Sequence, residues 1–113
     1  MTALRIHIYS DGADVREMLA ARDAGLVKGF TTNPTLMRKL GVTDYEAFAH
    51  EALRAVGDMP ISFEVFADEF DEMERQARLI ATWGDAIFVK IPITNTRGES
   101  AIPLIQRLSA AGV

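Results

Sequence analysis

Short apolar runs alternate with longer amphipathic stretches along the whole chain. The runs are rich in β-branched and aromatic side chains, which is typical of strands, and they cover residues 5–9, 26–30, 61–65 and 86–91. Each is followed by a stretch whose apolar residues recur at helical spacing. The order strand–helix, repeated four times, predicts an α/β fold in which helices cover parallel strands.

The predicted helices begin and end at recognisable signals. Thr43–Glu46 has the pattern of a capping box, and Gly57 is expected to end the helix that starts there. Pro34 is expected to open a helix, and Pro103 falls in the first turn of a helix beginning near Ser100 and ending at Gly112, where a missing backbone donor costs nothing. The helix expected to end at Gly84 has one apolar face: Phe70, Met73, Ala77, Ile80 and Ala81.

Alternation of side chains divides three predicted strands into two faces. The face expected under the helices is wholly apolar: Ile6, Ile8, Ile61, Phe63, Val65, Ile87, Val89 and Ile91. The opposite face carries the polar residues: His7, Tyr9, Asp11, Ser62, Glu64, Phe66, Phe88 and Lys90. His7 is interpreted as an interior polar residue near the start of its strand.

Asp11, Asn33, Glu64 and Lys90 fall at or near the carboxyl ends of four consecutive strands. α/β enzymes place their active sites at this end of the sheet or barrel. We therefore expect these residues to converge on one site. Each also has a simpler reading: Asp11 as a turn or helix cap, the Thr31–Pro34 stretch as loop geometry, and Lys90 as a strand-end lysine extending to solvent.

Lys90 carries the sharpest chemical hypothesis because its neighbours in Ile87–Pro92 are apolar. Burial disfavours the ammonium form of lysine, and the neutral amine can attack a carbonyl. The alternative is that Lys90 pairs with Glu64. A carboxylate such as Glu64 on an interior face is costly unless it is paired or hydrogen-bonded.

Composition narrows the remaining classes of function. The chain has 113 residues, of which 49% are hydrophobic, a net charge of −4 and no cysteine. The acidic balance disfavours nucleic acid as a partner, and the lack of cysteine excludes disulfides and thiolate chemistry. No apolar run approaches the roughly 20 residues of a membrane span, and no signal peptide is recognisable, so a cytoplasmic location and no membrane partner are expected.

Metal and nucleotide sites are also not expected. The acidic residues between Asp68 and Glu74 suit the start of a helix, where negative charge is favourable, and helical spacing would scatter them around a metal ion. The chain has no glycine-rich phosphate-binding motif of the P-loop or dinucleotide type.

Three motifs resemble the transaldolase family, including its small fructose-6-phosphate-aldolase-like members. They are Thr31–Thr35 (Thr-Thr-Asn-Pro-Thr), Ile61–Val65 and Phe88–Thr94. The resemblance runs in order through the whole chain and implies a (β/α)₈ TIM barrel that uses no cofactor. Such a barrel needs about 200–250 residues. Residues 1–113 would then be a single unit, the N-terminal half of the barrel with its first four βα units.

The resemblance also implies roles for individual residues. Lys90 would form a Schiff base with a ketose, Asp11 would act as the acid/base, and Glu64 would position a water molecule. Asn33 and Thr31 would hydrogen-bond the bound fragment. The substrates would be sugar phosphates of the pentose phosphate pathway, and a glutamate at the position of Glu64 goes with transaldolase activity in this family.

Two other functions stay open from the sequence. One is a fructose-6-phosphate aldolase that releases dihydroxyacetone, and the other is a non-catalytic half-barrel or open sheet that serves as a binding or structural module. Gly12 differs from the hydroxyl residue common after the family's aspartate, and the family's phosphate-binding residues lie on later strands. Four βα units leave strand edges exposed, so a homo-oligomer is expected.

Overall fold

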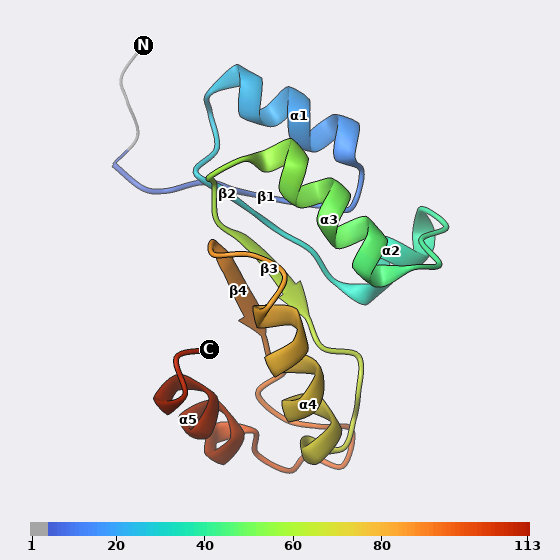
Figure 1. Cartoon of the computed structure of the whole chain (residues 1–113), viewed down its shortest axis with the longest axis vertical. Helices are drawn as coiled ribbons and strands as arrows, with labels where there is room; N and C mark the ends of the chain where they lie inside the picture. Colours follow the sequence, from blue (N-terminus) through green and yellow to red (C-terminus); the bar gives the residue numbers. More distant parts are fainter. Residues whose placement is uncertain (1–4) are drawn as a thin grey trace. The chain divides into compact units, whose positions relative to one another are not determined.

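A computed structural model describes residues 5–113 (Figure 1) and confirms the α/β class. Its parallel sheet has the strand order β1-β2-β3-β4. By its contacts the chain divides into two compact units, one ending at Ile61 and the other running from Ser62 to Val113. The elements in chain order are β1 (Tyr9–Asp11), α1 (Val15–Ala24), β2 (Gly29–Thr31), α2 (Pro34–Lys39), α3 (Tyr45–Val56), β3 (Ile61–Glu64), α4 (Phe70–Ala81), β4 (Ile87–Lys90) and α5 (Ile102–Ala110).

In the first unit, α1 and α3 lie side by side and pack against each other (Figure 1). β1 and β2 are paired in parallel, from Tyr9 opposite Gly29 to Asp11 opposite Thr31. The N-cap of α1 is Asp14, whose carboxylate accepts hydrogen bonds from two backbone N–H groups of the first turn. The unit's buried apolar residues include Met18, Val27, Phe30, Met37, Phe48, Ala49, Ala52, Ala55, Val56 and Ile61.

In the second unit, α4 packs against β4 and α5. The apolar face predicted for α4 is confirmed, since its Met73, Ala77 and Ile80 are buried. Phe63 of β3 is fully buried and meets the Trp83 ring edge-on, with the ring centroids 6.2 Å apart. This packing gives the unit its core.

The first strand differs from the prediction. β1 covers Tyr9–Asp11, and the residues before it are exposed: His7 lies on the surface, and Ile6 and Ile8 are 68% and 38% exposed. The interpretation of His7 as an interior residue was therefore wrong for this structure, as was the buried position expected for the two isoleucines. β-branched composition favours an extended chain, but hydrogen bonding to β2 decides where the strand lies. One hydrogen bond of this kind lies just before β1, where Lys28 N donates to Ile8 O (2.8 Å).

The helix boundaries also shift by a few residues. The N-cap of α3 is Asp44 and not Thr43, because the Asp44 carboxylate accepts a hydrogen bond from Ala47 N (3.0 Å). α4 ends at Ala81, before Gly84, and α5 begins at Ile102 with a proline in its first turn. None of the helices within residues 5–113 combines the length and apolar character needed to span a membrane.

Candidate functional site

Asp11 and Thr31 lie directly opposite each other at the carboxyl ends of β1 and β2. The Thr31 hydroxyl donates a hydrogen bond of 2.6 Å to Asp11 Oδ1, and Gly12 N donates to Thr31 O at 3.1 Å. The carboxylate is exposed, whereas Thr31 is half-buried. The structure therefore joins two of the predicted site residues, and the more buried threonine orients the aspartate.

Asn33 lies two residues beyond Thr31 and is the N-cap of α2. Its Oδ1 accepts a hydrogen bond from Leu36 N (3.0 Å), and Pro34 occupies the first turn, as expected. The cap uses only the amide oxygen and does not need the two N–H donors of the side chain. Asn33 can therefore combine a structural role with the binding of a hydrogen-bond acceptor.

Glu64 and Lys90 are the last residues of β3 and β4 in the second unit. Both side chains are half-buried, and Lys90 O accepts a hydrogen bond from Val65 N (3.2 Å). The predicted alternation holds in β3, where Phe63 is buried and Glu64 is not. Glu64 and Lys90 thus occupy the same end of two strands of this unit, the end at which α/β enzymes carry their reactive groups.

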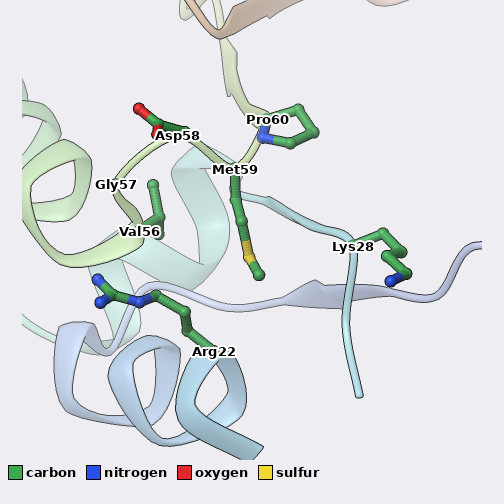
Figure 2. A pocket seen from close by; sticks show the side chains of 7 residues that line it. All are labelled: Arg22, Lys28, Val56, Gly57, Asp58, Met59 and Pro60. Atoms are coloured by element: carbon green, nitrogen blue, oxygen red, sulfur yellow. The ribbon is translucent and has the colours of Figure 1, made fainter. Parts of the chain in front are cut away.

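A pocket of about 500 Å³ in the first unit is lined by Arg22, Lys28 and the segment from Val56 to Pro60 (Figure 2). Arg22 has a structural role there: its Nη1 donates to Ala55 O (2.5 Å) in the last turn of α3, where carbonyls lack helical partners. In the view of Figure 2, Lys28 is set apart from Arg22 by the Met59 side chain. The pocket therefore contains none of the predicted site residues.

The acidic residues at the start of α4 contact a loop that the sequence did not link to them. Asp68 accepts hydrogen bonds from Thr96 N (2.8 Å) and Thr96 Oγ1 (2.7 Å). These two bonds hold the pKa of the Asp68 carboxyl below its ordinary value of 3.8, and the backbone bond has the larger effect. Glu69 binds the Arg97 guanidinium at 2.7 Å and 3.3 Å.

Arg97 lies among carboxylates, which fixes its charge. The guanidinium donates hydrogen bonds to Glu69 and to Glu99, and these bonds, with Glu69 the larger cause, raise its pKa. Hydrogen bonds that Glu99 accepts from the Asn95 amide and, with a smaller effect, from Arg97 hold the pKa of Glu99 below its ordinary value of 4.5. In residues 5–113, no cluster of three or more histidine or acidic side chains is arranged to hold a metal ion. The acidic stretch instead forms ion pairs and hydrogen bonds.

Strands alternating with helices, with polar side chains at the carboxyl ends of the strands, define an α/β protein built from βα repeats. The chain belongs to the transaldolase/fructose-6-phosphate aldolase family, whose model matches residues 8–113. The family predicted from the three motifs is therefore confirmed.

Curated relatives agree with this assignment. A protein of Dehalococcoides mccartyi named "Probable transaldolase" is 35% identical over 108 residues, which cover 96% of this chain and 48% of the relative. "Probable transaldolase 2" of Listeria monocytogenes is 37% identical over 93% of this chain and 45% of its own length. "Probable transaldolase" of Roseiflexus castenholzii is 38% identical over 90% and 46%. The chain thus spans about half the length of the curated relatives it matches.

Proposed function

We propose that this chain belongs to a Schiff-base enzyme that transfers a dihydroxyacetone unit between sugar phosphates. The observation that carries the proposal is the half-buried Lys90 at the carboxyl end of β4, in a chain of the transaldolase/fructose-6-phosphate aldolase family. The family description names two activities, transaldolase and fructose-6-phosphate aldolase, and we assign the same lysine-based aldol chemistry to both. Lys90 is therefore the residue on which the proposal depends.

The reaction begins when the neutral amine of Lys90 attacks the C2 carbonyl of a ketose phosphate. The carbinolamine that forms loses water and becomes a protonated imine, which can accept an electron pair. The C3–C4 bond then breaks, its electrons move toward the imine, and C4 leaves as the aldehyde of a shorter aldose phosphate. The three-carbon fragment stays on Lys90 as an enamine.

Asp11 is assigned the proton of the C4 hydroxyl, which must leave as that oxygen becomes a carbonyl. Because Thr31 donates to Asp11 Oδ1 (2.6 Å), the second carboxylate oxygen is the one we assign to the substrate. In the transfer step the same carboxyl group returns the proton to the acceptor's oxygen as the new C–C bond forms. Thr31 thus acts on the fragment partly by holding Asp11.

Glu64 and Asn33 are assigned to water and substrate. Glu64, on the strand next to that of Lys90, positions the water molecule that carries protons while the imine forms and hydrolyses. The N–H donors of Asn33 bind a hydroxyl of the three-carbon fragment, because the cap of α2 uses only its oxygen. The convergence of Asp11, Asn33, Glu64 and Lys90 on one site is part of the proposal.

The same proposal includes a complete (β/α)₈ barrel, sugar-phosphate substrates, a place in the pentose phosphate pathway and a homo-oligomeric assembly. Residues 1–113 supply its first four βα units, and the phosphate-binding residues come from later strands. A cytoplasmic location stays a prediction.

Borohydride trapping tests the proposal in the complete protein. Incubation with fructose 6-phosphate followed by borohydride should reduce the imine and leave a mass adduct on Lys90. This chain has three lysines, and Lys28 and Lys39 are exposed. Lys90→Arg should abolish the adduct on this chain, whereas Lys39→Arg should retain it. If wild-type protein shows no adduct on Lys90, the proposal is contradicted and a non-catalytic binding or structural module is favoured.

A second measurement distinguishes transfer from release. With erythrose 4-phosphate as acceptor, a transaldolase makes sedoheptulose 7-phosphate, whereas an aldolase releases free dihydroxyacetone. We expect transfer because Glu64 stands at the position where a glutamate accompanies that activity. Free dihydroxyacetone as the main product would assign the aldolase activity instead.

A further inference from the structure

The loop that follows Lys90 is closed by its own hydrogen bonds. Residues Thr94 and Ser100 form an antiparallel bridge, and Ala101 N donates to Ile93 O (2.8 Å). Inside the loop, Asn95 is only 7% exposed, and its Oδ1 accepts from the backbone N–H groups of both Arg97 and Glu99 at 3.0 Å. The loop at residues 94–100 is therefore held together by its own hydrogen bonds.

This loop is attached to the segment that follows β3. Both carboxylate oxygens of Asp68 bind Thr96, one through its backbone N–H and the other through its hydroxyl. A second bond lies closer to the strand, where Val65 N donates to Lys90 O (3.2 Å). The chain that leaves Lys90 is thus held to the chain that leaves Glu64 at two points, both within the second unit.

Asp68 and the neighbouring ion pair attach the loop in different ways. Both attachments are open to water, but Glu69 and Arg97 have long side chains that lose more entropy on pairing, and exposed ion pairs contribute little. Asp68 is short and binds two donors of the same residue, which fixes both direction and distance. Arg97 itself is surrounded by Glu69, Glu99 and Asp68, so its charge is already balanced and it is a poor candidate for binding a substrate phosphate.

We propose that Asp68 is a positioning residue for Lys90: by anchoring Thr96, it fixes the end of β4 from which the nucleophilic amine extends. The inference rests on the proposed function and goes beyond it, because it assigns Asp68 a role that is exerted through Thr96. A nucleophile must be held close to its attack geometry, and a displacement of about 1 Å costs up to about 100-fold in rate. Loss of the anchor therefore lowers the rate of imine formation more than it weakens substrate binding.

Variants of both partners test this in the complete protein. Asp68→Asn replaces one of the two carboxylate oxygens that accept from Thr96 with an NH₂ group, which cannot accept a hydrogen bond, and Thr96→Val removes the hydroxyl while keeping the shape. Each should lower the rate at which dihydroxyacetone is trapped on Lys90, and kcat, by about 10- to 100-fold, with KM changed much less. Thr96→Ser restores the hydroxyl and should restore most of the rate.

Glu72→Gln is the matched control, because Glu72 is a nearby carboxylate in the first turn of α4 that pairs with Arg75 and not with the loop. It should keep wild-type trapping. All rates are measured well below each variant's melting temperature, so that a merely structural loss appears in Tm and not in kcat. If Asp68→Asn proves unstable, Thr96→Val against Thr96→Ser decides the question.

Two failures can be told apart. Wild-type protein that forms no adduct overturns the proposed function and this inference with it. Wild-type protein that forms the adduct, together with Asp68→Asn or Thr96→Val variants that trap at the wild-type rate, overturns the role of Asp68 alone. Equal losses in Glu72→Gln and Asp68→Asn would also overturn it, because the effect would then be general to the acidic residues between Asp68 and Glu74.

Discussion

Gly29, at the start of β2, lies where the chain has no room for a side chain. A Cβ added there would be 2.6 Å from Tyr9 Cε2, 2.8 Å from Pro60 O and 3.0 Å from Pro60 Cγ. Carbon atoms ordinarily pack at about 3.5–4.0 Å. The Tyr9 ring can turn away, because it is partly exposed, but the Pro60 carbonyl accepts a hydrogen bond from Phe30 N (2.9 Å) and is held in place.

Gly29→Ala should therefore lower the free energy of unfolding by about 1–3 kcal/mol, the usual cost of forcing extra atoms into a packed site. Each kcal/mol corresponds to a fall in Tm of about 4–8 °C in a domain of this size. Gly12→Ala is the matched control, since an added Cβ there would meet no described heavy atom within 4 Å beyond its chain neighbours. Gly12→Ala should be neutral or slightly stabilising.

Urea unfolding followed by circular dichroism measures both variants, and a Tyr9→Ala background separates the two obstacles. We expect most of the cost of Gly29→Ala to remain in that background, because the Pro60 carbonyl is the contact that cannot move. A Gly29→Ala protein within about 0.5 kcal/mol of wild type would refute the steric argument. A cost that disappears with Tyr9→Ala would assign it to the ring instead.

Three further predictions follow from other contacts. Asn33→Asp keeps an oxygen for the cap of α2 but removes the amide donors, so it should preserve Tm while lowering kcat/KM. Asn33→Ala should also lose about 1 kcal/mol of stability, because it removes the cap. Equal activity of Asn33→Asp and wild type would contradict substrate binding by the amide. Phe63→Ala, at a fully buried position, should lower the free energy of unfolding in urea by about 3–5 kcal/mol. Phe88→Ala, at a position that is 62% exposed, should lower it far less. Similar losses in the two variants would contradict the assignment of the core. Hydrogen bonds lower the pKa of four carboxyls below 3.8 for Asp and 4.5 for Glu, namely Asp68, Glu72, Glu74 and Glu99. Because the pKa values of these carboxyls are lower in the folded state, their stabilisation is fully present above the ordinary pKa values and is lost as pH falls through the folded-state pKa values. The free energy of unfolding, measured from about pH 7 to about pH 3, should therefore fall mainly at the acid end. An unchanged urea midpoint over that range would contradict these pairings.

Local periodicity was sufficient to predict the faces of several elements. In β3, alternation correctly distinguished buried Phe63 from half-buried Glu64, and the apolar spacing in α4 identified the buried Met73. These predictions succeed because burial is decided within a few residues, by the repeat of two in a strand and 3.6 in a helix. The position of Lys90 at the end of β4 follows in the same way, from its place after an apolar run.

Contacts between distant residues could not be predicted in this manner. The position of β1 depends on the register that places Asp11 opposite Thr31, and β-branched composition alone extended the predicted strand back to residue 5. Asp68 could be assigned to the start of a helix, but not to Thr96 in a loop beyond the next strand. The strand position and the Asp68 contact both depend on the choice of a distant partner, which local spacing does not contain.

The sequence by itself thus determined the α/β class, the family and the strand ends that carry the polar residues, because these depend on local patterns and short motifs. Only the tertiary structure decided that Thr31 donates to Asp11 and that Asp68 anchors Thr96. The physical reason is that a hydrogen bond requires two groups within about 3 Å in a favourable direction. Strand register and loop docking set that geometry, and neither is encoded by the residues adjacent to the bond.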